Sequence, residues 1–150
     1  MLVKYSVSRC IDGQCNQQKY SRWLHRKAMA HVRRDRRREV TCTVERYKGE
    51  IHAAVCASEG RDYYTGEQLD WTLLSTWDNN AAKSGRVQYK KSLALLPTVD
   101  HTFDEAGQPK FVICSWYVND VKSDLTLAEF YRLCERILKH RGDCASPRGQ

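Results

Sequence analysis

The sequence predicts an α+β fold: a mainly helical single domain around a small two-stranded antiparallel hairpin that is followed by a helix. Two stretches within residues 20–60 carry apolar side chains at helical spacing. Two short apolar runs, 93–96 and 111–114, flank a connection that contains Gly107 and Pro109. A last stretch, 126–140, opens on a capping-box pattern and again repeats apolar residues at helical spacing.

The chain length and composition fit one domain. With 150 residues the chain can bury a sizeable core, and no internal linker divides it. We expect an N-terminal extension at 1–19, a basic helix and a second helix within 20–60, a strand–strand–helix core at 93–123 and a C-terminal helix at 126–140. No apolar run approaches the roughly 20 residues of a membrane span, so we expect no membrane partner. Seven cysteines, an odd number, favour reduced thiols, so we expect a cytoplasmic protein.

The first half of the chain predicts two helices. From Tyr20 to Arg38 the apolar residues fall near one face, with bases around the rest. From Glu45 to Ala57 apolar residues recur every four positions. We then expect a turn at 62–67, a short helix at 69–77 and a polar loop at 78–91.

The second half predicts the hairpin and its helices. We expect strands at 93–100 and 111–114, joined through residues 102–109. Ser115 can cap a short helix that ends near Lys122. Thr126 and Glu129 have capping-box spacing, and the helix they open should end near Gly142, before a frayed tail at 143–150. Its apolar face comprises Leu127, Phe130, Leu133, Cys134, Ile137 and Leu138.

The positive charge is concentrated in one element. The chain carries +7, whereas residues 19–38 alone carry +8 and hold a single acid, Asp35. Such a patch suits a polyanion, most simply nucleic acid. The residues we expect to contact nucleic acid are Arg26, Lys27, Arg33, Arg34, Arg36, Arg37 and Arg38. The alternative is that the run is a solvated helix face.

Three residues around the hairpin carry the predicted chemistry. Asp100 and His101 stand side by side at the expected end of the first strand, and Asn119 follows early in the helix after the second strand. A carboxylate, an imidazole and an amide are the minimal equipment for cutting a phosphodiester with one metal ion. An isolated Asp-His pair is more often a surface turn, and Asn119 alone could be a surface amide.

In this strand–strand–helix context, the residues resemble the ββα-metal module of HNH (His-Me finger) endonucleases. In that family the first strand ends in Asp-His or His-His, and the helix supplies an Asn or His ligand. Lys122 completes an N-x-x-K pattern with Asn119. W-L-x-R-K-A at 23–28, Y-T-G-E at 64–67 and L-P-T-V-D-H at 96–101 also resemble bacterial and phage proteins of HNH type.

The resemblance implies a role for each residue. Asp100 and Asn119 would hold a divalent metal, Mg²⁺ first and Mn²⁺ as an alternative, leaving most of its shell to water and phosphate. His101 would act as general base on the attacking water. Lys122 joins the predicted catalytic residues as a phosphate contact, and its alternative is a solvated lysine.

The sequence departs from the family in two places. Many members bind a structural zinc through CxxC pairs, but Cys114 has no such partner, so we expect no structural zinc. The middle Asn of the family name, which orients the histidine, is replaced by Lys110 or nearby Gln108.

The predicted function is therefore a metal-dependent endonuclease that hydrolyses phosphodiester bonds in DNA, most simply double-stranded. One alternative is a nucleic-acid-binding protein that keeps the fold but has weak or no catalysis. Another is an interaction module whose basic helix meets an acidic protein partner. The sequence leaves open whether the chain acts as a homodimer.

Overall fold

The computed structural model describes residues 4–76, 79–103 and 108–145. The elements in chain order are a 3-10 turn at Arg9–Ile11, α1 (Gln17–Arg36), α2 (Val44–Ser58), a 3-10 turn at Trp71–Leu73, α3 (Asn79–Ser92), β1 (Pro97–Phe103), β2 (Pro109–Ser115), α4 (Trp116–Lys122) and α5 (Leu127–Ala145). The two strands pair antiparallel. The predicted α+β class, with a two-stranded antiparallel hairpin followed by a helix, is confirmed.

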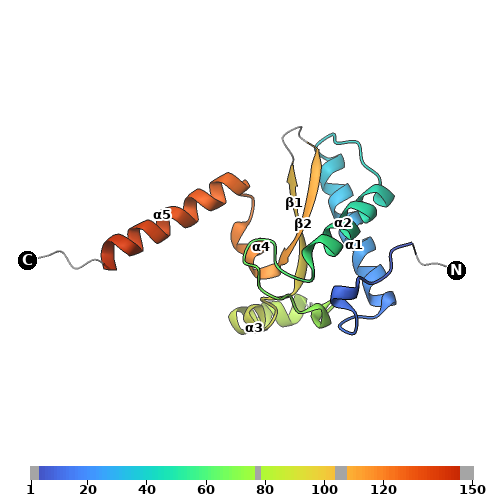
Figure 1. Ribbon diagram of the computed structural model, residues 1–150, viewed down its shortest axis with the longest axis horizontal. Helices are drawn as coiled ribbons and strands as arrows, with labels where there is room; N and C mark the ends of the chain where they lie inside the picture. The colour runs from blue at the N-terminus through green and yellow to red at the C-terminus, as the bar shows by residue number, and fades with distance from the viewer. Residues whose placement is uncertain (1–3, 77–78, 104–107, 146–150) are drawn as a thin grey trace, which may run out of the picture.

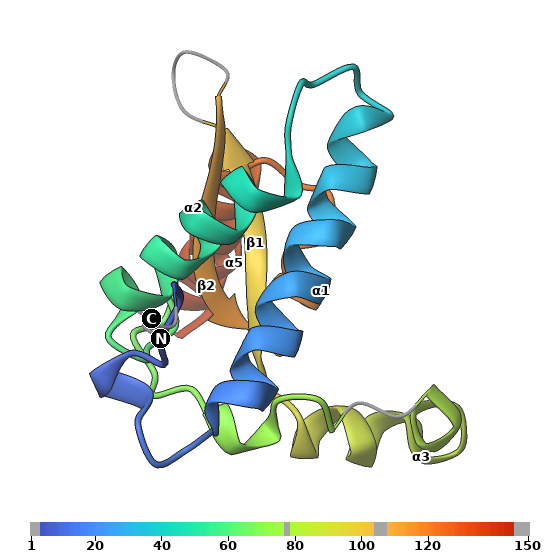
Figure 2. The same cartoon turned by 90° about the vertical axis from the view of Figure 1, so that its right-hand side faces the viewer.

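The hairpin lies between helices (Figure 1). α1 and α2 run across one face of the two strands, as the view turned by 90° also shows (Figure 2). α4 follows β2 directly and packs against the opposite face. α5 projects away from the rest of the chain (Figure 1). Within the described residues, no helix is long and apolar enough to cross a membrane.

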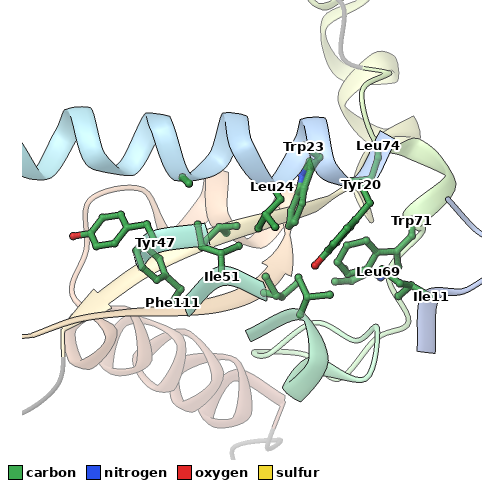
Figure 3. Packing of buried hydrophobic residues seen from close by; sticks show 14 of the residues in the cluster. Ile11, Tyr20, Trp23, Leu24, Tyr47, Ile51, Leu69, Trp71, Leu74 and Phe111 are labelled. Atoms are coloured by element: carbon green, nitrogen blue, oxygen red, sulfur yellow. The ribbon is translucent and has the colours of Figure 1, made fainter. Parts of the chain in front are cut away.

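The hydrophobic core fills the space between α1, α2 and the hairpin (Figure 3). Tyr20 and Leu24 of α1 are fully buried, as is Ile51 of α2. Ile11 is fully buried as well, so the segment expected as an N-terminal extension packs into this core. Burying side chains of this size is the main source of stability in a domain of this length.

The strand register decides which way each hairpin side chain points. Asp100 pairs with Val112, and His101 pairs with Phe111. Because successive strand residues point to opposite faces, His101 and Phe111 face α1 and α2, whereas Asp100 faces α4. β1 continues to Phe103, so the expectation that Asp100 and His101 end the strand is wrong.

Three other local predictions are wrong: the loop at 78–91, the helix at 69–77 and the start of the first strand at 93. Residues 79–92 form α3 where a loop was expected, because this stretch has no apolar stripe but is rich in helix formers such as Lys83, Gln88 and Lys90. The expected helix at 69–77 is only the 3-10 turn within its described part. The run 93–96 forms turns before β1, where Leu95 and Leu96 accept backbone hydrogen bonds from Asp70 and Trp116.

The helix caps in the second half are confirmed. The Ser115 hydroxyl accepts a hydrogen bond from the Val118 N–H, as an N-cap of α4 should. Thr126 and Glu129 form the reciprocal capping box: each backbone N–H donates to the other side chain. α5 runs past Gly142 to Ala145, and residues 146–150 of the predicted tail lie outside the described residues.

Candidate functional site

A groove of about 1010 Å³ opens where the C-terminal half of α1, β1 and the α4–α5 connection meet. Arg34 lines it from α1 and Arg38 from just beyond that helix, Asp100 and His101 from β1, and Lys122 from the end of α4. With Lys110 and Asp124 also present, its lining carries four bases and two acids. The groove is therefore suited to an anion, and it contains three of the four predicted catalytic and metal-binding residues.

Asp100 lies at the α4 side of the groove in a buried ion pair. The Lys122 Nζ is 3.2 Å from Oδ2 and 3.5 Å from Oδ1 of Asp100. The Tyr64 hydroxyl also donates a hydrogen bond to Oδ2. Both Asp100 and Lys122 are buried, so Lys122 is not the solvated lysine that the sequence left open.

The turn that carries Tyr64 is fixed to the hairpin. Asp62 accepts hydrogen bonds from the backbone N–H groups of Tyr64 and Thr65 through Oδ1, and from Ser115 through Oδ2. Burial raises the pKa of Tyr64, and the hydrogen bond to Asp100 raises it further. The Tyr64 hydroxyl therefore keeps its proton at neutral pH. The Y-T-G-E segment thus acquires a structural role: it holds a donor against the Asp100 carboxylate.

His101 points away from Asp100, toward α1. Its Nε2 lies 3.4 Å from Oδ2 of Asp35, and both side chains are buried. The imidazole stacks on Phe111, with ring centroids 5.0 Å apart and an interplanar angle of 20°. Burial lowers the pKa of His101, while Asp35 opposes that shift. The imidazole is therefore neutral near pH 7, as a general base must be.

Asp35 is the residue that the sequence analysis missed. Its side chain is fully buried within an arginine-rich segment, and Oδ2 accepts a hydrogen bond of 2.5 Å from the Tyr47 hydroxyl of α2. Oδ1 of Asp35 and Nε2 of His101 have no hydrogen-bond partner among the described residues. The helical spacing of the sequence could have predicted this burial. Asp35 follows His31 by four residues, so it belongs to the apolar face of α1.

The predicted residues are only partly brought together. Asp100 and His101 reach the groove from opposite faces of β1. Asn119 is half-buried on α4, one helical turn before Lys122, and is not among the groove-lining residues. The Asp100 carboxylate and the His101 imidazole therefore do not converge on one point, although both border the same groove.

The first two predicted nucleic-acid contacts on α1 are engaged elsewhere. Arg26 donates a hydrogen bond of 2.9 Å to the Ser75 hydroxyl. Lys27 donates a hydrogen bond of 2.7 Å to the Thr98 hydroxyl on β1, and burial lowers the pKa of Lys27 to about 8. Both side chains tie α1 to neighbouring segments of the fold.

The remaining bases gather at the C-terminal end of α1 and just beyond it. Arg34 and Arg38 line the groove, and all five are exposed: Arg33, Arg34, Arg36, Arg37 and Arg38. Arg36 also contacts the Cys42 carbonyl oxygen at 3.4 Å. The exposed positive charge therefore stands next to Asp100 and His101.

The donors available to a metal are oxygen atoms. Among the described residues, no group of three or more His, Cys, Asp or Glu is arranged to hold a metal ion, and six cysteines are free thiols. Mg²⁺ keeps several waters and needs only one or two protein carboxylates. The chemistry of the Asp100 carboxylate and the Asn119 amide fits such an ion, but Lys122 now neutralises that carboxylate.

No protein-family model, curated protein or solved structure matches this chain. The resemblance to HNH endonucleases therefore stays a prediction from the motifs.

Proposed function

We propose that this protein is a divalent-metal-dependent endonuclease that hydrolyses phosphodiester bonds in double-stranded DNA. One observation carries the proposal. A single groove is bordered by a buried carboxylate–lysine pair, a buried neutral imidazole and the exposed arginines at the end of α1. These are the groups that phosphodiester hydrolysis needs: a metal-binding oxygen, a base for water and cations for phosphate.

His101 acts as the general base in this proposal. A neutral imidazole that keeps its proton on Nε2, facing Asp35, leaves the lone pair of Nδ1 to accept a proton from water. Asp35 acts through His101 as a positioning residue: its carboxylate, 3.4 Å from Nε2 without a hydrogen bond in the structure, favours electrostatically the tautomer with its proton on Nε2. It takes over the task that the middle Asn performs in the HNH family, which the sequence replaces with Lys110 or Gln108.

Asp100 and Asn119 would hold the metal, with Lys122 beside them. The metal would stabilise the charge that develops on the phosphoryl group and on the leaving oxygen. Lys122 lies 3.2 Å from Asp100, so its ammonium would compete with a metal ion for that carboxylate. Once displaced, the ammonium would contact a phosphate at the same wall of the groove.

Arg34 and Arg38 bring the DNA backbone to the groove. They line the same groove as Lys122, so a phosphate bound there meets cations from more than one element. Binding should therefore weaken steeply as salt rises.

The proposal is tested by incubating the purified full chain with supercoiled plasmid and Mg²⁺ or Mn²⁺. Wild type should nick the plasmid, chelation by EDTA should stop it, and Asp100→Ala should be inactive. Asp120→Ala is the matched control, because Asp120 pairs with Lys90 at the surface and does not line the groove. Equal nicking by wild type and Asp100→Ala refutes the proposed site.

A second candidate is DNA binding without cleavage. The Asp100–Lys122 pair favours it, because a carboxylate already neutralised by lysine needs no metal. The orientation of Asp100 and His101 to opposite faces of β1 favours it too. Salt-dependent DNA binding by wild type, with no cleavage under any divalent metal, selects this candidate over the nuclease.

A further inference from the structure

Two exposed aromatic side chains line the basic groove. Phe103, the last residue of β1, is 47% exposed, and Tyr63, in the turn that carries Tyr64, is 57% exposed. Large aromatic side chains are mostly buried in folded proteins, and exposed ones that share a groove mark a place where a ligand binds. The proposed cleavage chemistry uses neither ring, so both are free to contact another part of the substrate.

The two aromatic residues are anchored at different levels of the hairpin. The Tyr63 backbone N–H donates a hydrogen bond of 2.9 Å to the Ile113 carbonyl oxygen, and Ile113 pairs with Val99. Tyr63 is therefore level with Val99, four residues before Phe103 on β1. That separation is about 13 Å along an extended strand. Asp100 lies between the two levels, so a chain bound to both aromatic residues would pass this carboxylate.

The charges around the two rings indicate what they bind. Arg34, Arg38, Lys110 and Lys122 line the same groove. Cations for the phosphates and aromatic rings for the bases are the combination with which proteins hold single-stranded nucleic acid. In an intact duplex the bases are stacked on one another, and a protein reaches their faces only when they leave the stack. The rings therefore suit unpaired bases.

The size of the groove favours one strand over two. Its volume is about 1010 Å³, and drug-sized molecules, a class that includes single nucleotides, occupy pockets of about 300–1,000 Å³. The groove has room for a few nucleotides, whereas a double helix, whose major groove alone is about 12 Å wide, is too bulky to enter it. Arg33 and Arg37 are exposed and do not line the groove, so they are available to the phosphates of an adjoining duplex.

We propose that the groove takes an unpaired segment within double-stranded DNA, with Phe103 and Tyr63 stacked on its bases. The inference rests on the proposed function and deepens it, because it names the form of DNA that the same groove binds. The cations of the groove hold the backbone of the unpaired strand, and stacking at two levels of the hairpin keeps that strand beside Asp100. A fully paired duplex contacts only the exposed arginines and binds more weakly.

Fluorescence anisotropy of two labelled DNAs in EDTA tests the proposal: a plain duplex, and the same duplex with a short central bubble of unpaired bases. Wild type should bind the bubble about tenfold more tightly or better. Phe103→Ala and Tyr63→Ala should each weaken bubble binding about tenfold and leave plain-duplex binding unchanged. Tyr117→Ala is the matched control, because Tyr117 is 55% exposed on α4 but does not line the groove.

Conservative variants separate stacking from any damage to the fold. Phe103→Trp and Tyr63→Phe keep an aromatic ring and should keep the affinity for the bubble. Equal affinity of wild type for the two DNAs overturns the inference, as do alanine variants that weaken both DNAs alike. Because EDTA removes divalent metal, the result does not depend on cleavage. A preference for the bubble without nicking in Mg²⁺ refutes the nuclease and supports this inference, and nicking without any preference does the reverse.

Discussion

Replacing Asp35 by Asn isolates its effect on His101. The Asp35→Asn side chain keeps the shape of the carboxylate but removes its charge. In the structure that carboxylate lies 3.4 Å from Nε2 of His101 and accepts a hydrogen bond from Tyr47. Since Asp35 does not line the groove, the substitution should leave substrate binding, and hence KM, nearly unchanged.

The size of the effect follows from the distance. A tightly bonded orienting carboxylate beside a catalytic histidine is worth about 10⁴-fold in kcat, and more remote supporting groups are worth about 10–100-fold. The separation of 3.4 Å between Asp35 and His101 exceeds the usual range for an N–H···O bond. We therefore expect Asp35→Asn to lower kcat about 100-fold, which corresponds to about 2.7 kcal/mol in the barrier.

The assay compares Asp35→Asn with Tyr47→Phe in steady-state cleavage of a labelled DNA duplex with Mg²⁺. Tyr47→Phe removes the other partner of the carboxylate and should destabilise the fold by about 1.5–3 kcal/mol, but it leaves the charge beside His101. Its kcat should stay within about tenfold of wild type. The reasoning is refuted if the two variants lose kcat in proportion to their loss of stability, or if Asp35→Asn is as active as wild type.

Three further predictions concern basic side chains in the groove and on α1. Lys122→Met should tighten Mn²⁺ binding about tenfold, measured by calorimetry, because the ammonium no longer competes for the Asp100 carboxylate. The same variant should slow cleavage, because it lacks the proposed phosphate contact. An unchanged Mn²⁺ affinity contradicts the competition. Burial lowers the pKa of Lys27 to about 8 from 10.5, so the unfolded chain binds this proton more tightly than the folded chain between those values. The Tm of wild type minus the Tm of Lys27→Met should therefore rise between pH 8 and pH 10.5. A difference that stays constant over this range contradicts the lowered pKa of Lys27. The DNA-binding constant K falls as salt rises, and Arg34→Ala and Arg38→Ala should each make the plot of log K against log salt less steep by about one. Arg26→Ala should leave the steepness unchanged. Equal slopes in all three variants refute the placement of phosphates in the groove.

Local signals in the sequence predicted much of the fold. The periodicity of α1 and α2, the Ser115 cap and the Thr126–Glu129 capping box each depend on residues within one or two turns of each other. Such patterns are carried by the chain itself and do not depend on what packs against them. α3 escaped prediction because its helicity rests on propensity without an apolar stripe.

Contacts between distant segments could not be read from the sequence. The role of Asp35 depends on His101 and Tyr47, which belong to different elements, and Asp35 is surrounded in sequence by arginines. The burial of Lys122 against Asp100 depends on how α4 meets β1. The motif predicted that Asp100 and His101 matter together, but the length of β1, which turns them to opposite faces, is set by its pairing with β2.

The most direct test of the nuclease proposal is single-turnover cleavage of a labelled DNA duplex by wild type and His101→Ala, with DNA binding measured in parallel. His25→Ala, at an exposed position on α1, is the matched control. The account predicts Mg²⁺-dependent cleavage by wild type and a fall of about 10²–10⁴-fold in His101→Ala, with binding retained. Absence of cleavage by wild type, or equal rates in wild type and His101→Ala, would contradict it.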